Sequence, residues 1–184
     1  MNVLASRGQL RASFIRWSLF TVPAVMLLGY LSGQVSGSAA ENPWFDALTK
    51  PSTFPPPATF GIVWTILYAM MGFALALICT AWGAKGRKIA IVLFVVQLAV
   101  NLLWSPMFFA WHEISGALIV LVVLDILVIA TIVAFWRVRR LAAYLMLPYL
   151  AWILFATLLN YQFLQANPEA DGATSPAAVQ RMEL

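Results

Sequence analysis

The chain has 184 residues, of which 62% are hydrophobic and only 10% are charged, and its formal net charge is +4. A soluble domain carries about 25% charged residues, so this composition excludes a water-exposed surface and predicts a polytopic membrane protein. The 11 Lys and Arg residues are separated by apolar runs and form no basic face, which excludes nucleic acid as a partner. One Cys and one His exclude a disulfide framework and a Cys/His metal cluster.

Five apolar runs are each long enough to cross a bilayer, because about 20 helical residues span its hydrocarbon core. Lipid offers no hydrogen-bond partners to exposed backbone groups, so helices are the expected form. The predicted fold is an all-α membrane protein, a bundle of five transmembrane helices in one domain over residues 17–166. Its spans are predicted at residues 17–33, 59–82, 88–110, 114–136 and 142–164.

The first run permits two interpretations. Residues 1–16, which contain three arginines, are predicted to form a cytoplasmic N-terminal segment, and "SGSAA" at residues 36–40 resembles a signal-peptide cleavage site. Against cleavage, Gly29 and Gly33 form a small-xxx-small pair suited to close helix packing. The run is therefore interpreted as a membrane span, with cleavage as the alternative.

The long first connection is rich in proline, which fixes φ and lacks a backbone donor. Pro51, Pro55 and Pro56 predict an ordered, non-helical lid over one mouth of the bundle. In the second run, Trp64 and Tyr68 are spaced i, i+4 and share a helix face.

The third run contains two amides and a Trp-Ser-Pro sequence. Gln97, Asn101, Trp104 and Phe108 are spaced i, i+4, i+7, i+11 and share one helix face. The amides could form interhelical hydrogen bonds, which contribute about 0.6 kcal/mol each in membranes. Alternatively, they could line a cavity that recognises a ligand beside an aromatic plane.

The fourth run has Asp125 near its middle, with no Lys or Arg at matching depth in the other runs. A lone carboxylate at bilayer depth costs about 2.5–3.5 kcal/mol on insertion scales. Three roles stay open for Asp125: a polar contact in a ligand cavity, a structural hydrogen bond, or a proton-linked function.

The fifth run repeats the pattern of aromatic and polar groups. Tyr149, Trp152, Ala156 and Asn160 share a face, and Pro148 is predicted to kink the helix. Residues 167–184 are polar and rich in Ala, Pro and Gly, and are predicted to form a disordered C-terminal tail.

Three runs thus each present aromatic side chains with a hydrogen-bonding group, which favours a shared pocket. Bulky aromatic walls with few polar anchors suit a large, flat, apolar ligand such as a sterol or a tetrapyrrole. His112 is the single candidate for an axial haem ligand, and an interfacial histidine is the alternative. No metal site and no required cofactor are predicted, and a sterol and a porphyrin or haem-type tetrapyrrole both stay open as the ligand at this point.

Basic residues are distributed unevenly between the predicted sides of the membrane. The N-terminal segment and the second and fourth connections hold nine Lys and Arg residues, and the opposite side holds only Lys50 and Arg181. The positive-inside rule then predicts a cytoplasmic N-terminus and an external C-terminus. The charge asymmetry favours the inner (cytoplasmic) membrane of a bacterium, with the outer membrane as the alternative.

Several stretches of the chain resemble the TspO/MBR family, the tryptophan-rich sensory proteins related to the mitochondrial translocator protein. They are "NPWFDALTKPS" at residues 42–52, "PP" at 55–56, "FGIVWTILYAMMG" at 60–72, "QLAVNLLWSPMFF" at 97–109 and "PYLAWILFATLLN" at 148–160. The resemblance covers residues 17 to about 167, in the same order.

The resemblance implies a five-helix bundle, commonly a homodimer, that binds porphyrins and other haem-pathway tetrapyrroles, and in some members cholesterol. Its pocket lies under the first loop, and the positions that match it are Trp64, Asn101, Trp104, Trp152 and Ala156.

The chain departs from the family pattern at two places. Ala58 stands where an aromatic residue is common, and Gln165 replaces the basic residue of a cholesterol-type motif after Tyr161. These departures put the shape of the lid and the binding of a sterol in doubt.

The predicted function is that of a membrane receptor, a tetrapyrrole-binding sensory or regulatory protein. A transporter of porphyrins or sterols is the alternative, although five spans cannot divide into equal repeats. A light-dependent porphyrin-degrading enzyme is the second alternative, with Trp64 and Trp152 as possible radical carriers. The runs contain no general acid–base pair, which argues against enzymatic activity.

Overall fold

The computed structural model of the chain describes residues 6–37 and 42–173. Five helices in this part are long and apolar enough to cross a membrane, which confirms the predicted all-α, five-helix bundle. They are α1 (Arg7–Val35), α3 (Pro57–Cys79), α4 (Arg87–Ser105, continued by the π-helical turn η1, Pro106–Ala110), α5 (Ile114–Val138) and α6 (Arg140–Ala166).

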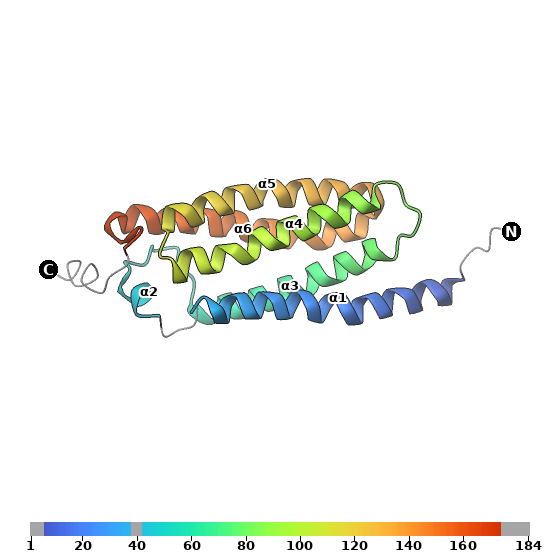
Figure 1. Ribbon diagram of the computed structural model, residues 1–184, viewed down its shortest axis with the longest axis horizontal. Helices are drawn as coiled ribbons and strands as arrows, with labels where there is room; N and C mark the ends of the chain where they lie inside the picture. Colours follow the sequence, from blue (N-terminus) through green and yellow to red (C-terminus); the bar gives the residue numbers. More distant parts are fainter. Residues whose placement is uncertain (1–5, 38–41, 174–184) are drawn as a thin grey trace.

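The helices lie side by side along the long axis of the molecule (Figure 1). The most extensive contacts join α5 to α6, α4 to α5, and α1 to α3, while α3 also packs on α6. One end of the bundle, here called the basic end, holds the start of α1 and the α3–α4 and α5–α6 connections. The opposite end, here called the lid end, holds the α1–α3 connection, η1 and the end of α6.

The first helix begins ten residues before the predicted span, so residues 7–16 of the predicted N-terminal segment continue α1, and the cytoplasmic location of this segment stays a prediction. The cause is a capping box: the Ser6 hydroxyl accepts from the Gln9 N–H, and the Gln9 side chain accepts from the Ser6 N–H. All other span boundaries differ from the prediction by three residues or fewer.

Close packing between α1 and α3 depends on two glycines. A Cβ on Gly72 would lie 2.6 Å from the Cα of Val22, and a Cβ on Gly29 would lie 2.1 Å from the Tyr68 ring. The close approach predicted for Gly29 is therefore confirmed, and Thr21 Oγ1 strengthens the contact by donating to Gly72 O at 2.8 Å.

The first connection contains a short helix, α2 (Pro43–Ala47), so the prediction of a non-helical lid is wrong for these residues. Asn42 caps the helix by accepting from the Phe45 N–H at 3.1 Å, and Pro43 occupies the first position, where its missing N–H has no cost. Trp44 is buried, so this short helix attaches the lid to the bundle.

The segment after α6 is ordered as far as Ala173, so the prediction of a disordered tail is wrong for residues 167–173. It forms the 3-10 turn η2 (Pro168–Ala170), and Asp171 Oδ1 accepts from the Ser115 N–H at 3.0 Å. A polar composition did not leave this segment free, because its polar groups pair with the start of α5. Residues 174–184 lie outside the described part.

The two prolines that the sequence reasoning noted in the third and fifth runs, Pro106 and Pro148, have different effects. Pro106 begins η1, in which the Trp111 N–H bonds back to Pro106 O at 3.0 Å, so the Trp-Ser-Pro sequence converts the end of α4 into a π-helical turn. Pro148, predicted to kink the last span, lies inside α6, which continues as one helix from Arg140 to Ala166.

Candidate ligand-binding region at the lid end

A chain of hydrogen bonds links α3, α4 and α6. Tyr68 OH donates to Asn101 Oδ1 at 2.9 Å, and Asn101 Nδ2 donates to Tyr149 OH at 3.0 Å. Tyr149 OH then donates to Gln97 Oε1 at 3.1 Å. Four of the residues predicted to form the site therefore meet, and both amides serve as interhelical hydrogen-bonding groups.

This chain of hydrogen bonds ends at a donor without a partner. Gln97 is fully buried, and its Nε2 has no hydrogen-bond partner in the described structure. A buried polar group without a partner costs about 1–3 kcal/mol. Gln97 therefore holds a donor that a polar atom of a ligand could satisfy.

A second polar group lies closer to the lid. Trp104 Nε1 donates to Asn160 Oδ1 at 3.1 Å, and Asn160 Nδ2 donates to Ile114 O at 2.9 Å. The Trp104 ring is stacked on Phe108 with centroids 5.3 Å apart. Trp104 packs against both the core of the bundle and the core beneath the lid, so it joins the two.

Aromatic rings flank these polar groups. Trp64 is stacked on Tyr68 at 5.1 Å and meets Tyr149 edge-on at 6.3 Å. Trp152 meets Phe60 edge-on at 5.8 Å. Ala156 packs on the same core. The residues predicted to line a cavity thus converge, but their rings and amides contact one another across the space between the helices.

The lid covers this region with side chains that the sequence reasoning did not select. Phe45 contacts Phe163, Phe54 contacts Phe60, and Trp44 meets Phe108 edge-on at 5.5 Å. The sequence carried a signal for them, since Asn followed by Pro marks a helix start and places the next residues on a short helix.

The predicted lid prolines shape the backbone of the connection, whereas the aromatic residues supply more of its buried surface. Pro51 O accepts from the Phe54 N–H at 2.9 Å in a turn, and Pro56 precedes α3 as its N-cap. Pro51 and Pro55 are half-buried, whereas Pro56 is exposed.

Polar groups attach the lid to the rest of the bundle. Asn42 Nδ2 donates to Phe109 O at 3.2 Å, and Thr53 Oγ1 donates to Gln162 Oε1.

Lys50 has its partners within the lid. Its Nζ donates to Asp46 O at 2.8 Å and lies 4.7 Å from the centroid of the Phe45 ring. Burial lowers the pKa of Lys50, and the nearby Asp46 carboxylate partly opposes this shift.

His112 belongs to the lid end and has partners there. Its ring is stacked on Trp44 at 4.4 Å, and its Nδ1 lies 2.9 Å from Ala173 O. A carbonyl can only accept, so Nδ1 carries the proton in this contact. Within residues 6–37 and 42–173, no three His, Cys, Asp or Glu side chains gather closely enough to hold a metal ion.

Asp125 lies between α5 and α6, apart from the hydrogen-bonded chain. Thr157 Oγ1 lies 2.9 Å from both Asp125 Oδ2 and Ile153 O, and Asp125 Oδ1 is buried without a partner in the described structure. Of the three roles left open for Asp125, a structural hydrogen bond is the one for which the structure supplies a partner.

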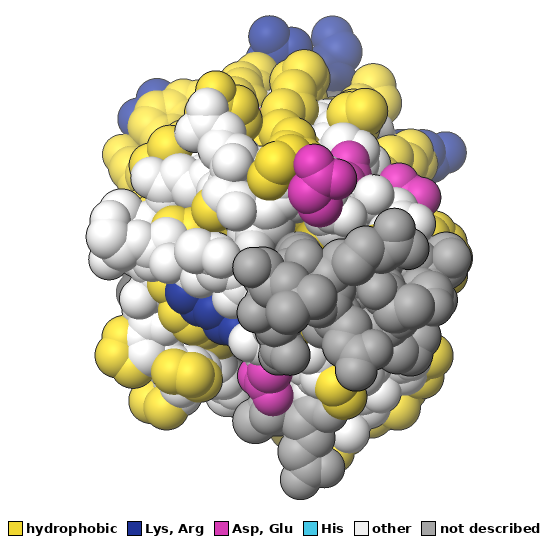
Figure 2. Space-filling view, turned by 90° about the vertical axis from the view of Figure 1, so that its left-hand side faces the viewer, with side chains coloured by type: hydrophobic (Ala, Val, Ile, Leu, Met, Phe, Trp, Pro, Cys, Tyr) yellow, Lys and Arg dark blue, Asp and Glu magenta, His cyan; other side chains and the backbone are white. Residues whose placement is uncertain are grey.

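The lid end and the basic end differ in charge. Figure 2 looks onto the lid end, where Asp and Glu side chains lie among hydrophobic ones and a Lys or Arg side chain is also visible on the face. The elements at this end carry Asp46, Glu113, Glu169 and Asp171. The positive-inside rule would place the basic end on the cytoplasmic side. The orientation in the membrane itself stays a prediction.

A five-helix membrane bundle with an aromatic lid over a polar and aromatic core defines an integral membrane protein with a candidate internal ligand site. The chain belongs to the TspO/MBR family, whose pattern matches residues 20–165. The resemblance inferred from the motifs is therefore confirmed.

Individual relatives agree with this assignment. The chain is 43% identical over 126 residues to "Tryptophan-rich protein TspO" of Chlorobaculum tepidum, which covers 68% of this chain and 80% of the relative. It is 35% identical over 138 residues to "Protein CrtK" of Rhodobacter capsulatus, covering 74% and 86%. It is 40% identical over 120 residues to "Translocator protein" of Homo sapiens, covering 64% and 71%.

Proposed function

We propose that this membrane protein binds a tetrapyrrole of the porphyrin type beneath its lid and acts as a sensory or regulatory protein. The observation that carries the proposal is the convergence of Trp64, Tyr68, Trp104 and Trp152 around a buried chain of hydrogen bonds from three helices. A flat aromatic ligand is recognised by stacking on such rings, and a few polar groups fix its orientation.

Binding would exchange contacts within the protein for contacts with the ligand. The ring of Trp64 is stacked on Tyr68, so a planar ligand would take the place of one of these rings. Gln97 Nε2, which lacks a partner, would donate to a polar atom of the ligand. The first exchange replaces one stacked pair with another, and the second gives a hydrogen bond to a donor that has none in the described structure.

The sensory part of the proposal rests on the relatives. One of them, 37% identical over 130 residues, is the "Tryptophan-rich sensory protein" of Cereibacter sphaeroides. The matched segment covers 69% of this chain and 80% of that relative.

The test is a titration of the purified protein in nanodiscs with protoporphyrin, followed by quenching of tryptophan fluorescence. We expect Asn101→Ala and Trp104→Phe each to weaken binding by about tenfold, since each removes one polar or stacking contact of about 1–1.5 kcal/mol. Trp136→Phe is the matched control, because Trp136 lies at the basic end of α5, where it contacts Tyr144. Unchanged affinity in both site variants would refute the proposed site.

Transport is the second candidate, favoured by relatives named "Translocator protein" in Homo sapiens and Sus scrofa. It requires a flux of porphyrin or sterol across proteoliposomes that saturates with substrate and exceeds that of protein-free vesicles. Saturable binding without such a flux would leave the sensory role and exclude transport.

A further inference from the structure

The basic end carries positive charge without a counter-charge from the described chain. Asp125 lies inside α5, and the remaining described acidic residues lie in lid-end elements. The Lys and Arg residues of the basic end whose side chains are described are Arg11, Arg16, Lys85, Arg87, Lys88, Arg137, Arg139 and Arg140. These cations must therefore be balanced by anions from outside the described chain.

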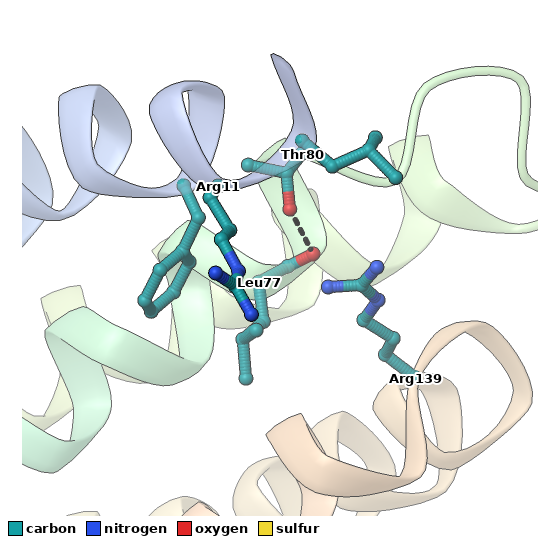
Figure 3. Close-up of a pocket in the computed structure, with 6 residues that line it drawn as sticks. Arg11, Leu77, Thr80 and Arg139 are labelled. Atoms are coloured by element: carbon teal, nitrogen blue, oxygen red, sulfur yellow. Dashed lines mark hydrogen bonds between the residues drawn. The ribbon is translucent and has the colours of Figure 1, made fainter. Parts of the chain in front are cut away.

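A cavity of about 220 Å³ lies at this end between α1, the end of α3 and the α5–α6 connection. Leu10, Phe14 and Leu77 give it an apolar floor, and Arg11 and Arg139 line it from opposite sides. Figure 3 shows the two guanidinium groups pointing toward the same space, with Thr80 between them and its hydroxyl bonded to Leu77 O. The cavity therefore combines two cations with an apolar wall.

Neither guanidinium has a hydrogen bond or ion pair in the described part of the chain, whereas two other arginines of the basic end, Arg87 and Arg140, have partners. Arg87 donates to Ile78 O and to Cys79 O, at 3.2 Å and 2.8 Å, and Arg140 lies over the ring of Trp136. Arg11 and Arg139 thus keep their full set of donors for an external anion, and guanidinium groups bind phosphate in a bidentate geometry.

The cavity lies at the depth of the lipid headgroups. A helix of 29 residues, such as α1, is about 43 Å long, and about 30 Å of it crosses the hydrocarbon core. Arg11, in the first turns of α1, therefore lies beyond the core when the lid end is at the opposite interface. An apolar floor beneath two cations at this depth fits a phosphate group joined to an acyl chain.

We propose that this cavity binds an anionic phospholipid, with its phosphate between Arg11 and Arg139 and its acyl chain against Phe14 and Leu77. The positive end of the α6 dipole adds to the attraction, since α6 begins next to Arg139 and has no side-chain cap. The bound lipid would join α1 to the α5–α6 connection and so stabilise the bundle at the end opposite to the lid. The site is separate from the proposed tetrapyrrole site.

The test measures the melting temperature of the full chain in a zwitterionic detergent, with added dioleoyl phosphatidylglycerol or dioleoyl phosphatidylcholine. The readout is the difference between the melting temperatures of one variant in the two lipids. A general loss of stability lowers both melting temperatures and therefore cancels. R11Q/R139Q removes the two cations of the cavity. K85Q/K88Q removes the same charge from exposed residues of the same end that do not line it.

We expect phosphatidylglycerol to raise the melting temperature of the wild type and of K85Q/K88Q by several degrees more than phosphatidylcholine does. R11Q/R139Q should need about thirtyfold more phosphatidylglycerol for the same shift, because each of the two cations near the membrane surface contributes about 1 kcal/mol. The single variants R11Q and R139Q, each expected to lose part of the response, replace the double variant if it does not purify.

Three results would overturn the proposal. The first is an undiminished response in R11Q/R139Q, and the second is an equal loss in K85Q/K88Q, which would show a general charge effect. The third is a response to inorganic phosphate as large as that to phosphatidylglycerol, which would show binding of a free anion with no part for the acyl chain.

Discussion

Asn167 and Thr49 exchange two hydrogen bonds, although 118 residues separate them along the chain. The Thr49 N–H donates to Asn167 Oδ1 at 2.7 Å, and Asn167 Nδ2 donates to Thr49 O at 3.0 Å. The side-chain amide thereby pairs with the lid backbone as a neighbouring strand would, and fastens the lid to the end of α6.

Asn167→Ala should loosen the lid. Each hydrogen bond contributes about 1 kcal/mol, so we expect amide exchange at Thr49 to become about tenfold faster or more. Hydrogen–deuterium exchange of lid peptides measures this directly. Gln165→Ala is the control, since Gln165 is exposed and bonds only to Tyr161 on its own helix. Equal protection of Thr49 in N167A and the wild type would show that the aromatic contacts alone hold the lid.

Gly29→Ala should disturb the hydrogen-bonded chain from outside it. The added Cβ would lie 2.1 Å from the Tyr68 ring, so the ring must shift, and the bond from its hydroxyl to Asn101 shifts with it. Overpacking of this kind costs about 1–3 kcal/mol. We expect a lower melting temperature in detergent and weaker porphyrin binding.

Gly61→Ala is the matched control for this variant, because it makes the same substitution within a helix and its Cβ would meet no atom within 4 Å. It should leave the melting temperature unchanged or slightly higher, because Ala favours the helical conformation over Gly. Equal effects of G29A and G61A would contradict the steric explanation.

Removal of the Tyr149 hydroxyl should lower the free energy of unfolding more than removal of the Tyr68 hydroxyl does. Tyr149→Phe leaves Asn101 Nδ2 and Gln97 Oε1 without a partner, whereas Tyr68→Phe frees only Asn101 Oδ1. Interhelical hydrogen bonds in membranes average about 0.6 kcal/mol, with a maximum near 1.7 kcal/mol, so a difference of about 1 kcal/mol is expected.

Thermal melting of Y68F, Y149F and the double variant measures this difference and the coupling between the two hydroxyls. Both tyrosines bond to the same amide, so their effects should not add. If the losses of stability add in the double variant, the chain of hydrogen bonds does not act as one unit.

Asp125→Asn should not destabilise the bundle. Asn keeps an acceptor for Thr157 and removes a carboxyl group that is buried with only one partnered oxygen. Insertion scales give about 2.5–3.5 kcal/mol for a charge at this depth, so the melting temperature should be equal or higher. Thr157→Val, which removes that partner, should lower it. A loss of more than about 1 kcal/mol in D125N would indicate that the carboxyl itself is required.

The spans and the shared faces could be predicted from the sequence because both depend on local properties. Helix length follows from bilayer thickness, and the 3.6-residue period places Asn101 and Trp104 on one face. The same period could not show which group each residue would meet. The structure pairs Asn101 with Tyr68 and Tyr149, and Trp104 with Asn160.

The segments outside the spans were predicted less well. Composition indicated a non-helical lid and a disordered tail, yet Pro43–Ala47 is helical and Asn167 pairs with Thr49. Polar residues lower the local tendency to fold, but here their hydrogen bonds are satisfied by segments distant in sequence. Such long-range pairing has no local signature.

The sequence by itself determined that five apolar helices cross the membrane with aromatic and amide groups turned to common faces, because burial in lipid acts on each segment separately. Only the tertiary structure decided which faces meet, how α2 and residues 167–173 close the lid end, and that Arg11 and Arg139 line one cavity. These relationships depend on helix packing, in which glycines such as Gly29 and Gly72 set how closely two helices approach.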